Sequence, residues 1–269
     1  MSQEMINLNI LSANRDNTDV RIQSSYIPID KNFKILRAGH HQGDRNIFDG
    51  RYCGFQCCAM ALAIILRSSI LPISDWTSDV VTQSMLAAHR FYAMVLYLQY
   101  VFQNPELLER AQDIFCYDLP GRYLRVQDFD VVKNCVSLFE KSFTLSYEAE
   151  SPLFGTLMDN SNSKSPVEGP GKTLLDSLHQ LFTFHNAGIF IAGGKSLAVI
   201  SHGDKFYLFD SHSCGPVGEP TLDGKACVIQ VETLSALANC CKRSAVDERL
   251  TYTVDHVDVT VCRDSPATK

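Results

Sequence analysis

The sequence predicts an α+β fold in which a helical lobe with a central helix packs on a mainly antiparallel sheet. Three observations support this prediction. Apolar residues recur at helical spacing through the first half of the chain. Four short runs of β-forming residues follow one another between residues 188 and 231. One further run, residues 59–66, is apolar on every side, which indicates a helix buried in the core.

The composition is that of an ordinary globular protein and excludes several classes of partner. Of 269 residues, 45% are hydrophobic and 20% are charged. The net charge is −6 and there is no lysine or arginine block, so the basic surface of a nucleic-acid-binding protein is missing. No apolar run approaches the length of a membrane span, and the first residues lack a signal-peptide pattern. We therefore expect a cytosolic or nuclear protein with neither nucleic acid nor membrane as partner.

The chain divides into an N-terminal arm and one domain. Residues 1–36 are mixed and polar, and we expect either a flexible arm or an edge strand there. Residues 37–269 form the domain. Within it, residues 151–172 are rich in Ser, Asn, Gly and Pro, which indicates a long exposed loop or a mobile hairpin.

The other elements follow from residue spacing. Helical spacing covers residues 57–66, 80–102, 126–139, 173–184 and 232–242. Thr77 or Ser78 can cap the second of these helices, and a further turn or two is expected within residues 105–114. The strand patterns are residues 142–150, 188–192, 197–201, 205–210, 226–231 and 250–261. The tight sequence His202-Gly203-Asp204 predicts an antiparallel hairpin between two of these strands.

Ten cysteines raise the question of disulfides. Such a number is typical of small secreted proteins, but this chain is neither small nor evidently secreted. Several of the cysteines lie in apolar runs, as Cys135 and Cys227 do. We therefore expect reduced thiols that pack in the core.

Cys57 is the candidate nucleophile. A polar loop with several glycines leads directly into it, and the buried helix begins there. The unpaired N–H groups and the positive end of the helix dipole favour a thiolate at that position. Gly54 allows a sharp turn before the helix and the close approach of a substrate. The alternative is an inert packing residue, because cysteine is among the most buried residue types.

Asp210 and His212 are the candidate partners of that thiol. They end a predicted strand two positions apart, so their side chains project to the same side. A carboxylate beside an imidazole fixes its tautomer and stabilises the imidazolium, as a Cys-His nucleophile system requires. No other histidine shows such a partner in the sequence, and His179 and His185 fit surface or helix-end positions. The alternative is a turn cap beside a solvated histidine.

A metal site is a further alternative. Asp210, His212 and Cys214 alternate along the chain, and a second set lies close together in sequence: His40, His41, Cys53 and Cys57. However, there is no CxxC pair, and a closed zinc site needs four well-spaced ligands. We therefore expect no metal and no cofactor.

Two blocks of the sequence resemble the N-terminal deubiquitinating domain of the herpesvirus large tegument proteins. The family shows a His-Gln-Gly-Asp segment, a following Phe, a Gly-x-Gln-Cys at the start of the central helix, and a later strand that ends in Asp-x-His. In this chain these motifs are His41-Gln42-Gly43-Asp44, Phe48, Gly54-Phe55-Gln56-Cys57 and Phe209-Asp210-Ser211-His212. The resemblance implies a papain-like cysteine protease fold.

The resemblance also implies a role for each matching residue. Cys57 would be the nucleophile, His212 the general base and acid, and Asp210 the carboxylate that orients it. Gln42 would donate to the oxyanion together with the Cys57 backbone N–H. Gln56 is a poorer donor, because adjacent residues diverge at the start of a helix. Cys58 points about a quarter turn away from Cys57, so we expect it to pack.

The implied substrate is ubiquitin, attached through isopeptide bonds. Expected partners are ubiquitin and polyubiquitinated proteins, with ubiquitin-like modifiers as further candidates, and other tegument or capsid proteins through a longer parent chain. The implied locations are the virion tegument and the cytoplasm and nucleus of the host cell. The rival functions are a non-catalytic ubiquitin-binding or tegument scaffold module, and a metal-dependent hydrolase that uses Asp210, His212 and Cys214.

Overall fold

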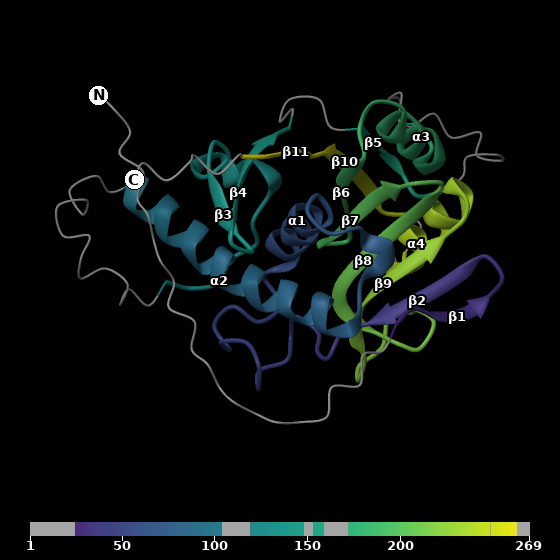
Figure 1. The fold of residues 1–269 in the computed structure, drawn as a ribbon, viewed down its shortest axis with the longest axis horizontal. Helices are drawn as coiled ribbons and strands as arrows, with labels where there is room; N and C mark the ends of the chain where they lie inside the picture. The colour runs from purple at the N-terminus through teal and green to yellow at the C-terminus, as the bar shows by residue number, and fades with distance from the viewer. Residues whose placement is uncertain (1–24, 104–118, 148–152, 159–171, 248, 263–269) are drawn as a thin grey trace, which may run out of the picture.

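The computed structural model describes residues 25–103, 119–147, 153–158, 172–247 and 249–262. They form two antiparallel sheets and four α-helices, as Figure 1 shows. The predicted turns within residues 105–114 lie outside the described residues. Among the described helices, none is both long enough and apolar enough to cross a membrane.

The larger sheet has eight strands in the order β1-β2-β9-β8-β7-β6-β10-β5, and every neighbouring pair is antiparallel. Its strands are β1 (Ile27–Asp30), β2 (Phe33–Arg37), β5 (Leu153–Thr156), β6 (Ala187–Ala192), β7 (Lys195–His202), β8 (Lys205–Cys214), β9 (Lys225–Val231) and β10 (Thr251–His256). The smaller sheet has the order β11-β4-β3, with β3 (Val136–Leu138), β4 (Lys141–Ser146) and β11 (Asp258–Val261).

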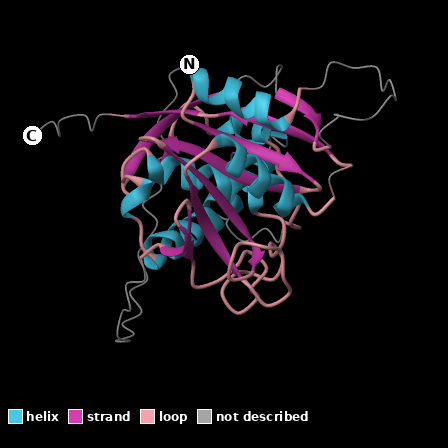
Figure 2. Cartoon of the chain, turned by 90° about the vertical axis from the view of Figure 1, so that its right-hand side faces the viewer, coloured by secondary structure: helices cyan, strands magenta, loops and turns pink. Residues whose placement is uncertain are grey.

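Helices cover both faces of the eight-stranded sheet (Figures 1 and 2). One face packs against α1 (Cys57–Ser68) and α2 (Ser78–Gln103), and the other against α3 (Leu174–Phe184) and α4 (Leu234–Ala245). Successive side chains of β8 point to opposite faces of the sheet and so enter both cores. Tyr207 and Phe209 pack on the α1 side, whereas Leu208 packs on the α3 side. The predicted α+β architecture, with a central helix on an antiparallel sheet, is confirmed.

Helix α1 is the centre of the larger core cluster. All ten residues from Cys57 to Leu66 are buried, as their continuous apolar run predicts. The helix packs against α2 on one side and against β6, β7 and β8 on the other. Each fully buried Leu or Ile contributes roughly 1.5–3 kcal/mol relative to an exposed side chain. This packing fixes the position of Cys57, the first residue of the helix.

The helix predicted over residues 126–139 is wrong in its second half. A short 3-10 helix, η4 (Val126–Val131), is followed by β3 and the β3–β4 hairpin. Phe139 and Glu140 form the two-residue turn with φ values of 54° and 60°. Residues with side chains rarely adopt such left-handed angles, so the sequence carries no turn signal there.

Three further segments differ from or refine the sequence predictions. The single strand predicted over residues 250–261 is two strands, divided at Val257, whose N–H donates to the Ala187 carbonyl at 3.0 Å. The predicted loop 151–172 contains β5, which pairs with β10, and residues 159–171 lie outside the described residues. Residues 27–37 contain the edge strand β1 and its neighbour β2, so the division placed after residue 36 falls inside β2. Residues 1–24 are not described.

We predict that Asp255→Asn stabilises the fold above pH 6. Burial raises the pKa of Asp255 from 3.8 to about 6. Between these values the folded state binds more protons than the unfolded state, so the Asp255 contribution to stability falls as pH rises and then stays low. The neutral amide avoids this cost, which is at most about 3 kcal/mol.

The measurement is urea unfolding at about pH 7.5 and about pH 4. The gain in free energy of unfolding should be present at the higher pH and small at the lower one. Asp204→Asn, in the exposed β7–β8 turn, is the matched control and should change little at either pH. A loss of stability at the higher pH in Asp255→Asn would contradict the prediction.

Candidate active site

The loop before α1 is held against one end of the large sheet by backbone hydrogen bonds. The N–H of Ala38 donates to the Ala226 carbonyl at 2.8 Å, and the Ala226 N–H donates to the His40 carbonyl at 2.9 Å. The Gln42 N–H donates to the Ser211 carbonyl at 2.8 Å. These bonds bring Gln42 next to the end of β8, although the two segments lie far apart in the sequence.

Gln42 is buried, with 2% of its surface exposed. Its Oε1 has no hydrogen-bond partner among the described residues. A buried acceptor without a hydrogen-bond partner lowers the stability of the fold. The Gln42 side chain is therefore a candidate functional group.

Aromatic packing sets the direction of the chain as it reaches α1. Gly54 has φ of +86°, a left-handed angle that glycine adopts without strain. The rings of Phe48 and Tyr52 flank His89 of α2, with centroids at 5.4 and 5.9 Å. The Oε1 of Gln56 lies 2.7 Å from Nδ1 of His89, so this amide is engaged with α2. The predicted divergence of Gln56 and Cys57 is consistent with this contact.

Cys57 lies at the N-terminus of α1, where no side chain caps the helix and the first turn has no acidic residue. The sulfur lies beside the ring of His212 from β8 and beside Ser196 from β7. Burial alone would raise the pKa of Cys57. The hydrogen bond and charge of His212, with hydrogen bonds from the Ser196 hydroxyl and N–H, outweigh it and lower the pKa below the usual 9.0.

Asp210 holds the imidazole of His212 from the other side. Its Oδ1 accepts from the His212 backbone N–H at 2.9 Å and lies 2.7 Å from the ring Nδ1, which leaves Nε2 for the sulfur. Burial would lower the pKa of His212, but Asp210 and Cys57 raise it to about 9. Burial would raise the pKa of Asp210, but His212 lowers it. The arrangement therefore favours an imidazolium between a carboxylate and a thiolate.

The structure thus brings together the four predicted residues: Gln42, Cys57, Asp210 and His212. A thiolate-imidazolium pair is favoured from the lowered pKa of Cys57 up to about pH 9, where His212 loses its proton. Such a pair can attack a carbonyl carbon and then protonate a leaving amine.

Ser196 is a site residue that the sequence reasoning missed. It is 5% exposed and is the second residue of β7. Gly193 and Gly194, with φ values of 57° and 75°, form the two-residue turn before it. A lone serine in a buried strand carries no sequence signal, because only the packing of α1 on β7 brings it near Cys57.

The neighbouring cysteines have raised pKa values and remain thiols. Burial raises the pKa of Cys58 well above 9.0 and also raises that of Cys53. A hydrogen bond with Cys227, together with burial, raises the pKa of Cys214. The nine described cysteines are all free thiols, as the sequence predicts, and Cys227 is buried, but the prediction that Cys135 packs in the core is wrong, because it is exposed.

Histidine environments correct one sequence interpretation and bear on the metal-dependent alternative. Nδ1 of His185 lies 2.9 Å from Asp258, and Nδ1 of His40 lies 3.3 Å from Asp44, so His212 is not alone in having a carboxylate partner. Among the described residues, the group close enough to share a metal ion is His185, His256 and Asp258. It does not include Asp210, His212 or Cys214, so the geometry does not favour the metal-dependent rival.

We predict that Asp210→Asn lowers the pKa of His212 from about 9 toward 6.5, because the amide carries no charge to stabilise the imidazolium. The measurement is an NMR titration of the His212 ring. Asp44→Asn, which changes the carboxylate beside His40, is the control and should leave His212 unchanged. An unaltered titration in Asp210→Asn would show that another group sets the charge of His212.

Comparisons with known proteins agree with this architecture. None of the curated protein sequences matches the chain. A crystal structure of the ubiquitin-specific protease encoded by murine cytomegalovirus tegument protein M48, in complex with a ubiquitin-based suicide substrate, aligns with a TM-score of 0.61. The two share 18% sequence identity over 87% of this chain and 89% of the other. The fold is papain-like, as the sequence predicted.

The family comparison covers most of the chain. Residues 37–263 match the model of the herpesvirus tegument protein N-terminal conserved region. The matched region contains α1, β7 and β8, and therefore Cys57, Ser196 and His212. This chain belongs to the herpesvirus tegument protein family, as a member that carries its N-terminal conserved region.

Proposed function

We propose that this protein is a cysteine protease that hydrolyses ubiquitin isopeptide bonds. The observation that carries the proposal is the contact of Cys57 with His212, whose pKa of about 9 keeps the ring protonated at neutral pH. The substrate class is supported by the M48 protein, which has the same fold and is described as a ubiquitin-specific protease.

The reaction begins with attack of the Cys57 thiolate on the isopeptide carbonyl carbon. The carbonyl oxygen becomes an oxyanion, which the Cys57 backbone N–H and the Gln42 amide stabilise. The C–N bond then breaks as the His212 imidazolium transfers its proton to the departing lysine amine. This step leaves a thioester on Cys57 and a neutral imidazole.

Hydrolysis of the thioester returns the site to its starting state. His212 takes a proton from water, and the resulting hydroxide attacks the thioester carbonyl through the same oxyanion geometry. The thiolate leaves as the ubiquitin carboxyl group forms, and the imidazolium is restored. Asp210 does not exchange protons in this sequence but holds the ring orientation throughout. Ser196 is a donor that stabilises the thiolate before attack.

The substrate tail would reach the thiolate in an extended conformation. The ubiquitin C-terminus ends in Gly-Gly, and pairing along a strand edge is the binding mode that an extended peptide favours. Polyubiquitinated proteins and ubiquitin-like modifiers are the candidate substrates, and other tegument or capsid proteins are candidate partners. Tegument is the location that the family indicates, and the host cytoplasm and nucleus are the proposed places of action.

We predict that ubiquitin bearing a C-terminal electrophile forms one covalent adduct with this protein. Intact mass spectrometry should show a single addition on the parent and none on Cys57→Ala, because only Cys57 is activated by His212. Cys53→Ala is the matched control, since that half-buried thiol has a raised pKa, and it should react like the parent.

The outcomes separate the rival functions. An adduct on Cys57→Ala would show that another thiol reacts. No adduct on folded parent protein would favour the non-catalytic module, and binding of unmodified ubiquitin would then distinguish a ubiquitin-docking module from a tegument scaffold.

We also predict that Gln42→Ala lowers kcat for a ubiquitin amide substrate by about 10²–10³-fold with little change in KM, because the donor acts on the oxyanion. Steady-state kinetics measure both constants. Gln180→Ala, on the exposed face of α3, is the control. A change confined to KM would assign Gln42 to substrate binding instead.

A further inference from the structure

A second group of polar side chains lies where α3 ends and where β10 passes into β11. His185 is the C-cap residue of α3, and its N–H donates to the Leu181 carbonyl at 2.8 Å. His256 is the last residue of β10 and Asp258 is the first residue of β11. The three residues therefore come from three separate elements that the fold brings together.

The backbone around this group is fixed by strand pairing. His256 lies opposite Gly188 in the β10–β6 ladder. The next residue, Val257, donates its N–H to the Ala187 carbonyl at 3.0 Å. The end of α3 and the β10–β11 junction are thus held side by side by hydrogen bonds that do not involve the side chains of the group.

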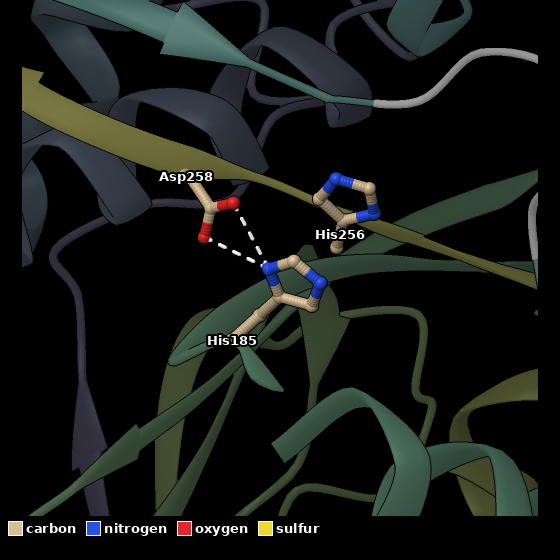
Figure 3. A group of neighbouring side chains, drawn as sticks. All are labelled: His185, His256 and Asp258. Carbon is tan, nitrogen blue, oxygen red and sulfur yellow. Dashed lines mark hydrogen bonds and ion pairs between the residues drawn. The ribbon is translucent and has the colours of Figure 1, made fainter. Parts of the chain in front are cut away.

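The three side chains lie next to one another, as Figure 3 shows. The Nδ1 of His185 lies 3.0 and 2.9 Å from the two carboxylate oxygens of Asp258. The rings of His185 and His256 are stacked, with centroids 4.0 Å apart and planes 13° apart. One nitrogen from each ring and one carboxylate oxygen lie within 4.8 Å of one another.

We propose that His185, His256 and Asp258 form a Zn²⁺ site. Two imidazole nitrogens and one carboxylate oxygen are a donor set that zinc takes in proteins, with water in the fourth position. A tetrahedral ion with ligand distances of about 2.1 Å needs donor atoms about 3.4 Å apart, so the donor atoms must approach one another and the stacked rings must turn toward the ion to complete the site. The ion takes the place of the hydrogen bond between the His185 ring and the Asp258 carboxylate, and the proton of the neutral imidazole then resides on its other ring nitrogen.

The setting allows an ion to enter and leave. His185 and His256 are half-buried, and Asp258 is exposed. Asp258 also lines a surface cavity of about 410 Å³, together with Ser68 and Ser69 at the end of α1. Water can therefore reach the Asp258 carboxylate, and a bound ion remains exchangeable.

The site would act on the fold and not on the reaction. Cys57 begins α1 and the cavity lies at its other end, and a helix of 12 residues is about 18 Å long. An ion shared by α3, β10 and β11 would tie the eight-stranded sheet to the three-stranded sheet. The inference does not depend on the proposed protease activity.

The test is a zinc titration of the whole chain after treatment with a chelator. Thermal unfolding of the parent should shift upward by several degrees with added ZnCl₂, because an ion that binds the folded state stabilises it. In the variant carrying His185→Gln with His256→Gln, this shift should be lost. His202→Gln, an exposed histidine that lines the same cavity, is the matched control and should keep the shift.

Cobalt substitution separates this site from the thiols. Co²⁺ bound by nitrogen and oxygen gives visible absorption without the thiolate charge-transfer band that cysteine ligands produce. The Asp258→Asn variant, which preserves shape, should bind Co²⁺ at least about tenfold more weakly than the parent. An equal thermal shift in the double variant, or a thiolate band in the parent that persists in Asp258→Asn, would overturn the proposal.

Discussion

The pairing of Cys57 with His212 is the interaction on which the candidate site depends. Neither residue would have its altered pKa alone, because each is buried and burial favours the uncharged form of both. Their contact forms only when α1 packs on β7 and β8, so the chemistry of the site is a consequence of core packing. The continuous apolar surface of α1 is the sequence feature that drives this packing.

Two buried carboxylates show how a hydrogen-bonding partner reverses the effect of burial on a pKa. Asp210 and Asp255 are 1% and 6% exposed, yet the pKa of the first is lowered and that of the second is raised. The difference is His212, whose ring and backbone N–H both bond to Asp210. A buried acid is therefore informative about function only together with the group that it faces.

Much of the fold was predictable because apolar residues recur with a regular period along its helices and strands. Helices α1 and α2 and the strands β6 to β9 follow from apolar spacing, which residue order records directly. The β3–β4 turn was not predictable, because Phe139 and Glu140 adopt left-handed angles that their residue types disfavour. The break at Val257 was also missed, since its hydrogen bond to Ala187 is a tertiary contact.

The candidate site shows the same division between local and tertiary information. Asp210 and His212 are two residues apart, so strand alternation predicts their common side, and the start of an apolar helix singles out Cys57. Gln42 was assigned by resemblance to a family, and the structure adds its bond to Ser211. Ser196 reaches Cys57 through the packing of α1 on β7, and the contact of His185 with Asp258 depends on the pairing of β10 with β6. No local pattern records either.

The central claim is that Cys57 and His212 form a charged pair at neutral pH. The most direct measurement is the ultraviolet absorbance of the Cys57 thiolate as a function of pH, taken as the difference between the parent and Cys57→Ala. The account predicts a thiolate that appears below the usual pKa of 9.0 and that shifts upward in His212→Gln. A Cys57 that titrates as an ordinary thiol in both proteins would contradict it.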